Sequence, residues 1–100
     1  MKRYKKLIFV DADDTSRAPM AKVIMKTKPL FRPIEIDSRG LVVLFSQPIN
    51  QKAEAVLISN GYSAKDHASA ALSSRDIGED TLILTMEGEQ REKIREEYPE

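Results

Sequence analysis

Three aspartates and one arginine lie within seven residues near the start of the chain. They are Asp11, Asp13, Asp14 and Arg17. Carboxylates grouped this closely can bind a hard cation such as Mg²⁺, and one of them can act as a nucleophile or a general acid. Arginine adds a planar cation that binds oxyanions through paired hydrogen bonds. The cluster therefore favours phosphate chemistry, either as simple anion binding or as metal-dependent phosphoryl transfer.

The neighbours of this cluster predict the elements that position it. An apolar run at residues 7–10 reads as a buried strand, and Pro19 suits the first turn of a helix. A tight loop between the two would direct its free N–H groups and the helix dipole at one point. Acidic residues at such a bend also occur simply as caps of free amides, and this interpretation stays open for Asp13 and Asp14.

The composition indicates one small domain, spanning residues 1–100. Lys plus Arg and Asp plus Glu number 16 each, so the net charge is zero and a nucleic-acid partner is not expected. The basic residues 1–6 run into the first strand without a long apolar segment, so neither a signal peptide nor a membrane span is expected. The chain has no cysteine, which excludes thiolate chemistry and fits a cytoplasmic location.

Apolar patterns along the chain alternate between strand and helix, which predicts an α/β fold with a parallel sheet. We expect strands at residues 7–10, 34–37 and 82–85, and helices at residues 19–28, 50–60 and 87–98. Helical spacing predicts that the first helix packs on the sheet through Met20, Val23, Ile24 and Thr27. The same spacing predicts that the second helix packs on the sheet through Ala53, Val56 and Leu57.

Three local signals mark where helical segments begin and end. Asn50 could cap the second helix, and Gly61 could end it in a left-handed turn. Ser73 and Asp76 have the spacing of a capping box, which predicts a short helical turn at that point.

The segment around Asp11 resembles the phosphate-binding loop of the low-molecular-weight protein tyrosine phosphatases. In that family a strand is followed by cysteine, five residues, arginine, a hydroxyl residue and proline; the thiolate attacks phosphorus, while loop amides and the arginine hold the phosphate oxygens. Asp11 stands at the cysteine position, Arg17 at the arginine, and Ala18 at the hydroxyl residue. The resemblance implies a degenerate, catalytically inactive member. The implied anion-binding loop comprises Ala12, Asp13, Asp14, Thr15, Ser16 and Arg17.

The resemblance extends through residues 36–40, 47–50, 67–72 and 80–86. It implies a three-layer α/β/α fold with flavodoxin-like strand order, shortened to about three strands. It also implies that Ser38 and His67 support the loop, and that Asp14 replaces an asparagine of the same reach. The family's last strand, last helix and general-acid loop have no counterpart before Glu100. We therefore expect the edge of the strand at 82–85 to be covered by a rearranged segment or by a second copy of the chain.

Two alternatives remain for the loop. Residues 11–15 also fit Asp-x-Asp-x-Thr, the first motif of the haloacid-dehalogenase superfamily, in which Asp11 would be the nucleophile and Asp11 and Asp13 would hold Mg²⁺. Later partners such as Lys65 and Asp80 are guesses under this interpretation. Alternatively, the Asp11 carboxylate occupies the loop itself, held by the amides and Arg17.

The expected function is that of a binding module. Its ligand would be a phosphate-like anion, a phosphorylated partner or a second copy of the chain. No cofactor is expected, except Mg²⁺ under the alternative.

Overall fold

The computed structural model describes residues 4–28, 34–86, 92 and 94–95. The elements are β1 (Lys6–Asp11), α1 (Arg17–Lys26), β2 (Glu35–Gly40), α2 (Gln51–Ser59), the 3₁₀ turn η1 (Ser74–Asp76) and β3 (Thr81–Thr85). Each expected strand and the first two helices are present, with ends shifted by at most three residues. The helix expected at 87–98 lies mostly outside the described residues.

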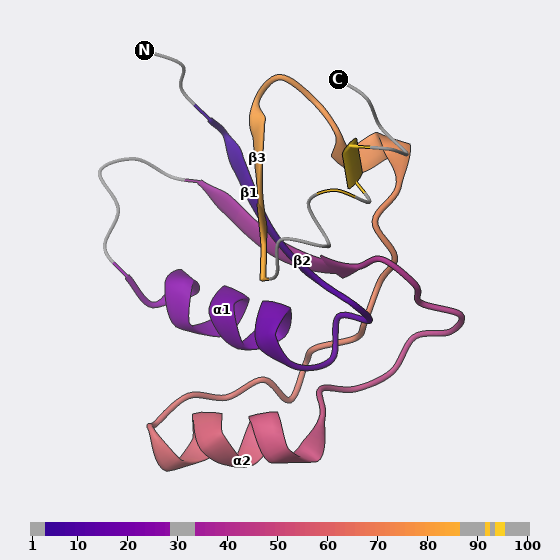
Figure 1. The fold of residues 1–100 in the computed structure, drawn as a ribbon. Coiled ribbons are helices and arrows are strands. Elements are labelled where there is room, and N and C mark those ends of the chain that lie inside the picture. The colour runs from indigo at the N-terminus through magenta and orange to yellow at the C-terminus, as the bar shows by residue number, and fades with distance from the viewer. Residues whose placement is uncertain (1–3, 29–33, 87–91, 93, 96–100) are drawn as a thin grey trace.

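The strands form one parallel sheet in the order β2-β1-β3 (Figure 1). In register, Phe9 of β1 lies beside Ser38 of β2 and Leu84 of β3. The order equals the first three strands of a flavodoxin-like sheet. The predicted α/β class and the three-stranded parallel sheet are confirmed.

The central strand β1 supplies both faces of the sheet with buried side chains. Phe9 packs with Ile36 and with Ala18 of α1 on one face. Ile8 and Val10 pack on the other face with Leu72, near η1. Because successive side chains of a strand point to opposite faces, one short apolar run can hold two layers together.

The expectation that α1 packs on the sheet through Met20, Val23, Ile24 and Thr27 is wrong. Met20, Val23 and Ile24 pack against the cluster around Leu57 of α2, whereas Ala21 and Met25 face the sheet. Figure 1 shows the reason, because α1 lies between the sheet and α2 and therefore needs two apolar faces.

The expected packing of α2 on the sheet is wrong. Ala53 and Leu57 are buried, but in the cluster that joins α2 to α1, and the exposed fraction of Val56 is 50%. The buried pair follows i, i+4 spacing, which gives only a narrow stripe. This helix packs on α1, and most of its other residues are exposed to solvent.

The expected helix ends are confirmed. The Asn50 side chain accepts hydrogen bonds from the N–H groups of Lys52 (2.8 Å) and Ala53 (3.2 Å). Gly61 follows α2 with φ of 84°, a left-handed conformation that glycine adopts without strain. Ser73 and Asp76 form the capping box of η1.

We expect Asn50→Ala to lower the free energy of unfolding by about 1 kcal/mol, because two amides at the start of α2 lose their acceptor. Urea denaturation of the variant measures this loss. Gln51→Ala, one residue later on the exposed side of the same helix, is the matched control. Equal stability of Asn50→Ala and the parent chain would contradict the role of the cap.

The third strand, β3, lies at one edge of the sheet. Among the described residues no strand pairs with its outer side, and the Leu84 side chain has an exposed fraction of 40%. The expected dimer through this edge remains a prediction. In the part of the chain that the structure describes, no helix is long and apolar enough to cross a membrane.

Candidate functional site

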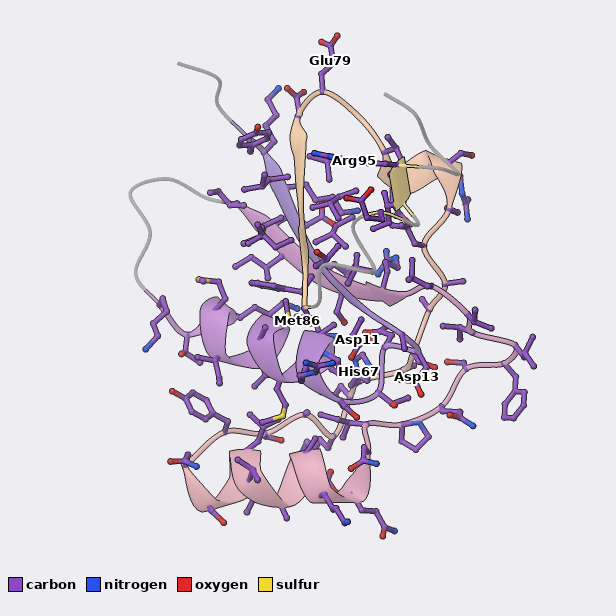
Figure 2. All side chains as sticks on the ribbon, in the orientation of Figure 1. Asp11, Asp13, His67, Glu79, Met86 and Arg95 are labelled. Carbon is purple, nitrogen blue, oxygen red and sulfur yellow. The ribbon has the colours of Figure 1, made fainter. Side chains whose placement is uncertain are left out.

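The candidate site is the loop of residues 12–16, which connects the carboxyl end of β1 to the start of α1. Figure 2 shows Asp11, Asp13 and His67 gathered at this end of the sheet. A second segment reaches the same place, because Gly40 at the end of β2 bonds to Ala70 and Leu72. Ligands of open α/β sheets bind at the carboxyl ends of the strands.

The Asp11 side chain is bound to the loop through both of its carboxylate oxygens. Oδ1 accepts a hydrogen bond from the Asp14 N–H (2.5 Å), and Oδ2 accepts one from the Ala18 N–H (3.0 Å). Only 3% of the residue is exposed. An internal carboxylate therefore occupies two of the amide donors that a loop of this shape offers to an anion.

The Asp13 side chain binds within the loop as well. Its Oδ1 accepts hydrogen bonds from the Thr15 N–H (3.2 Å) and the Thr15 hydroxyl (2.6 Å). This is the amide-capping role that remained open for Asp13. The N–H groups of Ala12, Asp13 and Ser16 have no acceptor within the described part of the chain.

The loop turns at Asp14, whose φ is 59° and whose side chain is fully buried. Its Oδ2 accepts a hydrogen bond from the Ala70 N–H (3.0 Å), but Oδ1 has no hydrogen-bond partner in the described structure, and neither has the buried Ser38 hydroxyl. Burial raises the pKa of Asp14, although the Ser38 hydroxyl, the Ala70 amide and His67 partly offset this.

His67 joins the loop to α1. Its Nε2 lies 2.7 Å from the Asp14 carbonyl oxygen, and its Nδ1 lies 2.7 Å from Lys22 Nζ. An ammonium group can only donate, so Nδ1 accepts and Nε2 carries the proton that is donated to Asp14. Ser38 and His67 thus both lie against Asp14, where a support for the loop is needed.

No sequence motif points to Lys22, which lies in α1 and contacts His67. Burial lowers the pKa of its amine, and the charges of Asp14 and Asp37 partly offset this effect. The signal for this residue was its position, because a lysine between two apolar residues of a helix lies at the boundary of a packed face.

Arg17 is the first residue of α1, and its side chain is exposed beside the loop. This position suits a cation that would meet an anion at the loop.

The two suggested partners of an aspartyl-phosphate site do not both lie near Asp11. Asp80 is at the opposite end of the sheet, where its carbonyl oxygen accepts hydrogen bonds from Lys5 and Lys6 at the start of β1. That guess is wrong. Lys65 is exposed in the segment before His67.

A metal ion held by Asp11 and Asp13 remains a prediction. Over the described ranges, no group of three or more His, Cys, Asp or Glu side chains is placed to hold a metal ion. Both Asp11 oxygens and one Asp13 oxygen already accept hydrogen bonds from the loop.

The chain matches the family model for low molecular weight phosphotyrosine protein phosphatase over residues 6–100. A protein-arginine-phosphatase of Geobacillus stearothermophilus is 30% identical, over 95% of this chain and 63% of its own length. A probable low molecular weight protein-tyrosine-phosphatase of Ralstonia nicotianae is 24% identical, over 95% of this chain and 64% of its own length. The chain thus spans less than two thirds of these relatives.

Solved structures of arginine and tyrosine phosphatases superpose on the chain. The arginine phosphatase from Geobacillus stearothermophilus superposes with a TM-score of 0.86 at 28% identity, over 95% of this chain and 60% of that one. A low molecular weight protein tyrosine phosphatase from T. tengcongensis superposes with a TM-score of 0.84 at 30% identity, over 95% and 67%.

Proposed function

Because the chain belongs to the low molecular weight phosphotyrosine protein phosphatase family, we propose that it binds a phosphate-like anion at the β1–α1 loop without the thiolate reaction. The family's nucleophile position holds Asp11, and the chain contains no cysteine. Ala18 supplies no hydroxyl beside it. Thiolate attack on phosphorus therefore has no nucleophile here.

The observation that carries the proposal is the division of the loop amides into two sets. Asp11 and Asp13 accept hydrogen bonds from the N–H groups of Asp14, Thr15 and Ala18. The N–H groups of Ala12, Asp13 and Ser16 have no acceptor among the described residues. This second set, with the exposed Arg17 beside it, can bind an oxyanion.

The charge of the loop sets the expected affinity. Asp11, Asp13 and Asp14 place three carboxylates beside the ligand, and these oppose a phosphate dianion. Binding of free phosphate is therefore weak. A phosphorylated side chain on a partner protein gains further contacts outside the loop. The similarity to a probable tyrosine phosphatase and to an arginine phosphatase fits this class of ligand. A cytoplasmic location is part of the proposal, because phosphorylated proteins are abundant there.

We expect inorganic phosphate to shift the amide ¹H–¹⁵N signals of residues 12–18 saturably. Asp13→Asn should strengthen this binding by about three- to tenfold, because asparagine keeps the Oδ1 acceptor of the Thr15 N–H and hydroxyl and removes one like charge beside the ligand. Arg17→Ala should weaken it by a similar factor. Arg75→Ala, an exposed arginine of η1, is the control and should leave affinity unchanged.

The same titration decides between the proposal and its alternatives. Shifts that require Mg²⁺, together with phosphatase turnover that Asp11→Asn abolishes, would replace it with the aspartyl-phosphate mechanism. An absence of shifts in both conditions would mean that the loop holds only its own carboxylates. Equal affinity of the Arg17→Ala and parent chains would remove Arg17 from the site.

A further inference from the structure

A groove separate from the loop lies between α1 and residues 61–67, the segment that follows α2. Figure 1 shows this segment returning beside α1. The groove has a volume of about 380 Å³, and the side chains that matter for its chemistry are Lys22, Val23, Lys26, Tyr62, Ala64 and His67. Ligand sites in proteins have volumes of roughly 300–1,000 Å³. None of the loop residues 11–17 lines this groove.

The walls of this α1 groove are partly apolar. Val23, Tyr62 and Ala64 belong to the cluster that joins α1 to α2, and the two larger side chains are only partly buried. Their remaining surface faces the groove, where it could cover a small apolar group. The groove therefore offers an apolar surface that is fixed by the packing of two helices.

The charge of the α1 groove is positive. Its lining includes Lys22 and Lys26 against one acidic residue, Asp66. Lys22 is half-buried and donates one of its three N–H groups to His67 Nδ1. Among the described residues its amine has no other hydrogen-bond acceptor and no carboxylate within the 4.0 Å of an ion pair.

A half-buried ammonium group is costly to keep when only one of its three N–H groups has a protein acceptor. Burial lowers the pKa of Lys22, and the charges of Asp14 and Asp37 only partly offset this. An anion placed in the groove would supply the missing acceptor for the two remaining N–H groups. One compact ammonium group suits one carboxylate, whereas a phosphate dianion is better matched by several donors in a fixed array.

We propose that the α1 groove binds a small amphiphilic carboxylate, a molecule whose carboxylate pairs with Lys22 and whose apolar body lies against Val23, Tyr62 and Ala64. Lys26, which is exposed at the rim, adds a weaker attraction. His67 connects this site to the loop through the Asp14 carbonyl oxygen, so that binding also shifts the amide signals of the loop.

The test uses 3-phenylpropionate as the probe. The uncharged 3-phenylpropanamide, which has the same apolar body, is the control compound. Amide ¹H–¹⁵N spectra of the full chain should show saturable shifts at Val23, Tyr62 and Ala64 with the acid, at millimolar affinity for a ligand of this size. The amide should bind at least about tenfold more weakly, because it carries no charge for Lys22.

Two variants distinguish the contributions of Lys22 and Lys26 to binding. Lys22→Met keeps the stem and removes the charge, so it should weaken binding at least about tenfold, and Lys26→Met about twofold. Lys52→Met, an exposed lysine of α2 outside the groove, is the control and should bind as the parent does.

Three outcomes would overturn the proposal: no saturable shifts in the groove, equal binding of acid and amide, or groove shifts that inorganic phosphate produces more strongly than 3-phenylpropionate. If Lys22→Met does not fold, the comparison of acid with amide on the parent chain still decides. Loop shifts with phosphate alone would bear on the anion-binding loop and not on this groove.

Discussion

Replacement of Gly40 with alanine is expected to lower the free energy of unfolding by about 3 kcal/mol and to abolish the phosphate-dependent shifts of the loop. A Cβ atom at Gly40 would lie 2.5 Å from the Asp13 carbonyl carbon and 2.7 Å from the Asp14 nitrogen. Both atoms belong to the backbone, so no side-chain rotation relieves the overlap. Either the loop or the end of β2 must move.

The end of β2 is less free to move than the loop is. Gly40 donates a hydrogen bond to the Ala70 carbonyl (2.9 Å) and accepts one from the Leu72 N–H (2.8 Å). The loop is therefore expected to shift, which would break the hydrogen bonds between Asp11 and the amides of Asp14 and Ala18. The predicted loss of phosphate binding follows from this shift.

Urea denaturation and the phosphate titration together measure this effect. Gly78→Ala is the matched control, because a Cβ there meets only the Thr81 hydroxyl at 4.0 Å and should cost nothing. A Gly40→Ala chain as stable as the parent, with unchanged loop signals, would show that the close approach of β2 to the loop is dispensable.

Local patterns in the sequence were enough to predict the strands, the ends of α2 and the position of the loop. The apolar run before Asp11 and the alternation of strand and helix are local signals, and a parallel sheet follows from them with few choices. Asn50 and Gly61 likewise act on their own neighbours. Such features need no knowledge of distant contacts.

Features that depend on contacts between elements far apart in the sequence could not be predicted from local patterns. Helical spacing places the stripe of Met20, Val23 and Ile24 on the sheet, but it packs on α2, because α1 has neighbours on two sides. Lys22 was overlooked, since its partner His67 is 45 residues away in the sequence. The pairing of Asp11 with the loop amides was one of several possibilities that the loop geometry had to distinguish.

Asp14→Asn is expected to raise the free energy of unfolding by about 1–3 kcal/mol at pH 7. Asp14 Oδ1 and Ser38 Oγ are both buried without a hydrogen-bond partner, and an unmet buried polar group costs about that much. Asparagine keeps an oxygen for the Ala70 N–H and places an N–H₂ group where it can donate to Ser38. Asparagine also tolerates the left-handed φ of 59°.

The expected gain depends on pH, and its sign follows from the raised pKa of Asp14, which burial causes. The folded chain binds this proton more tightly than the unfolded chain does. The contribution of Asp14 to stability is therefore fully present below the ordinary value of 3.8 and is lost as the pH rises through the folded pKa. Asparagine has no such proton, so the difference in stability between variant and parent should be smallest below pH 3.8 and should grow toward neutral pH.

Urea denaturation of Asp14→Asn and the parent chain across this range measures the difference directly. Asp66→Asn provides the matched control, because Asp66 is exposed and its replacement should leave the stability difference near zero at every pH. A gain of the same size at all pH values would assign the effect to the new hydrogen bond alone. A loss of stability at neutral pH would mean that the attraction of the Asp14 charge to His67 and Lys22 outweighs its burial, contrary to the direction of the pKa shift.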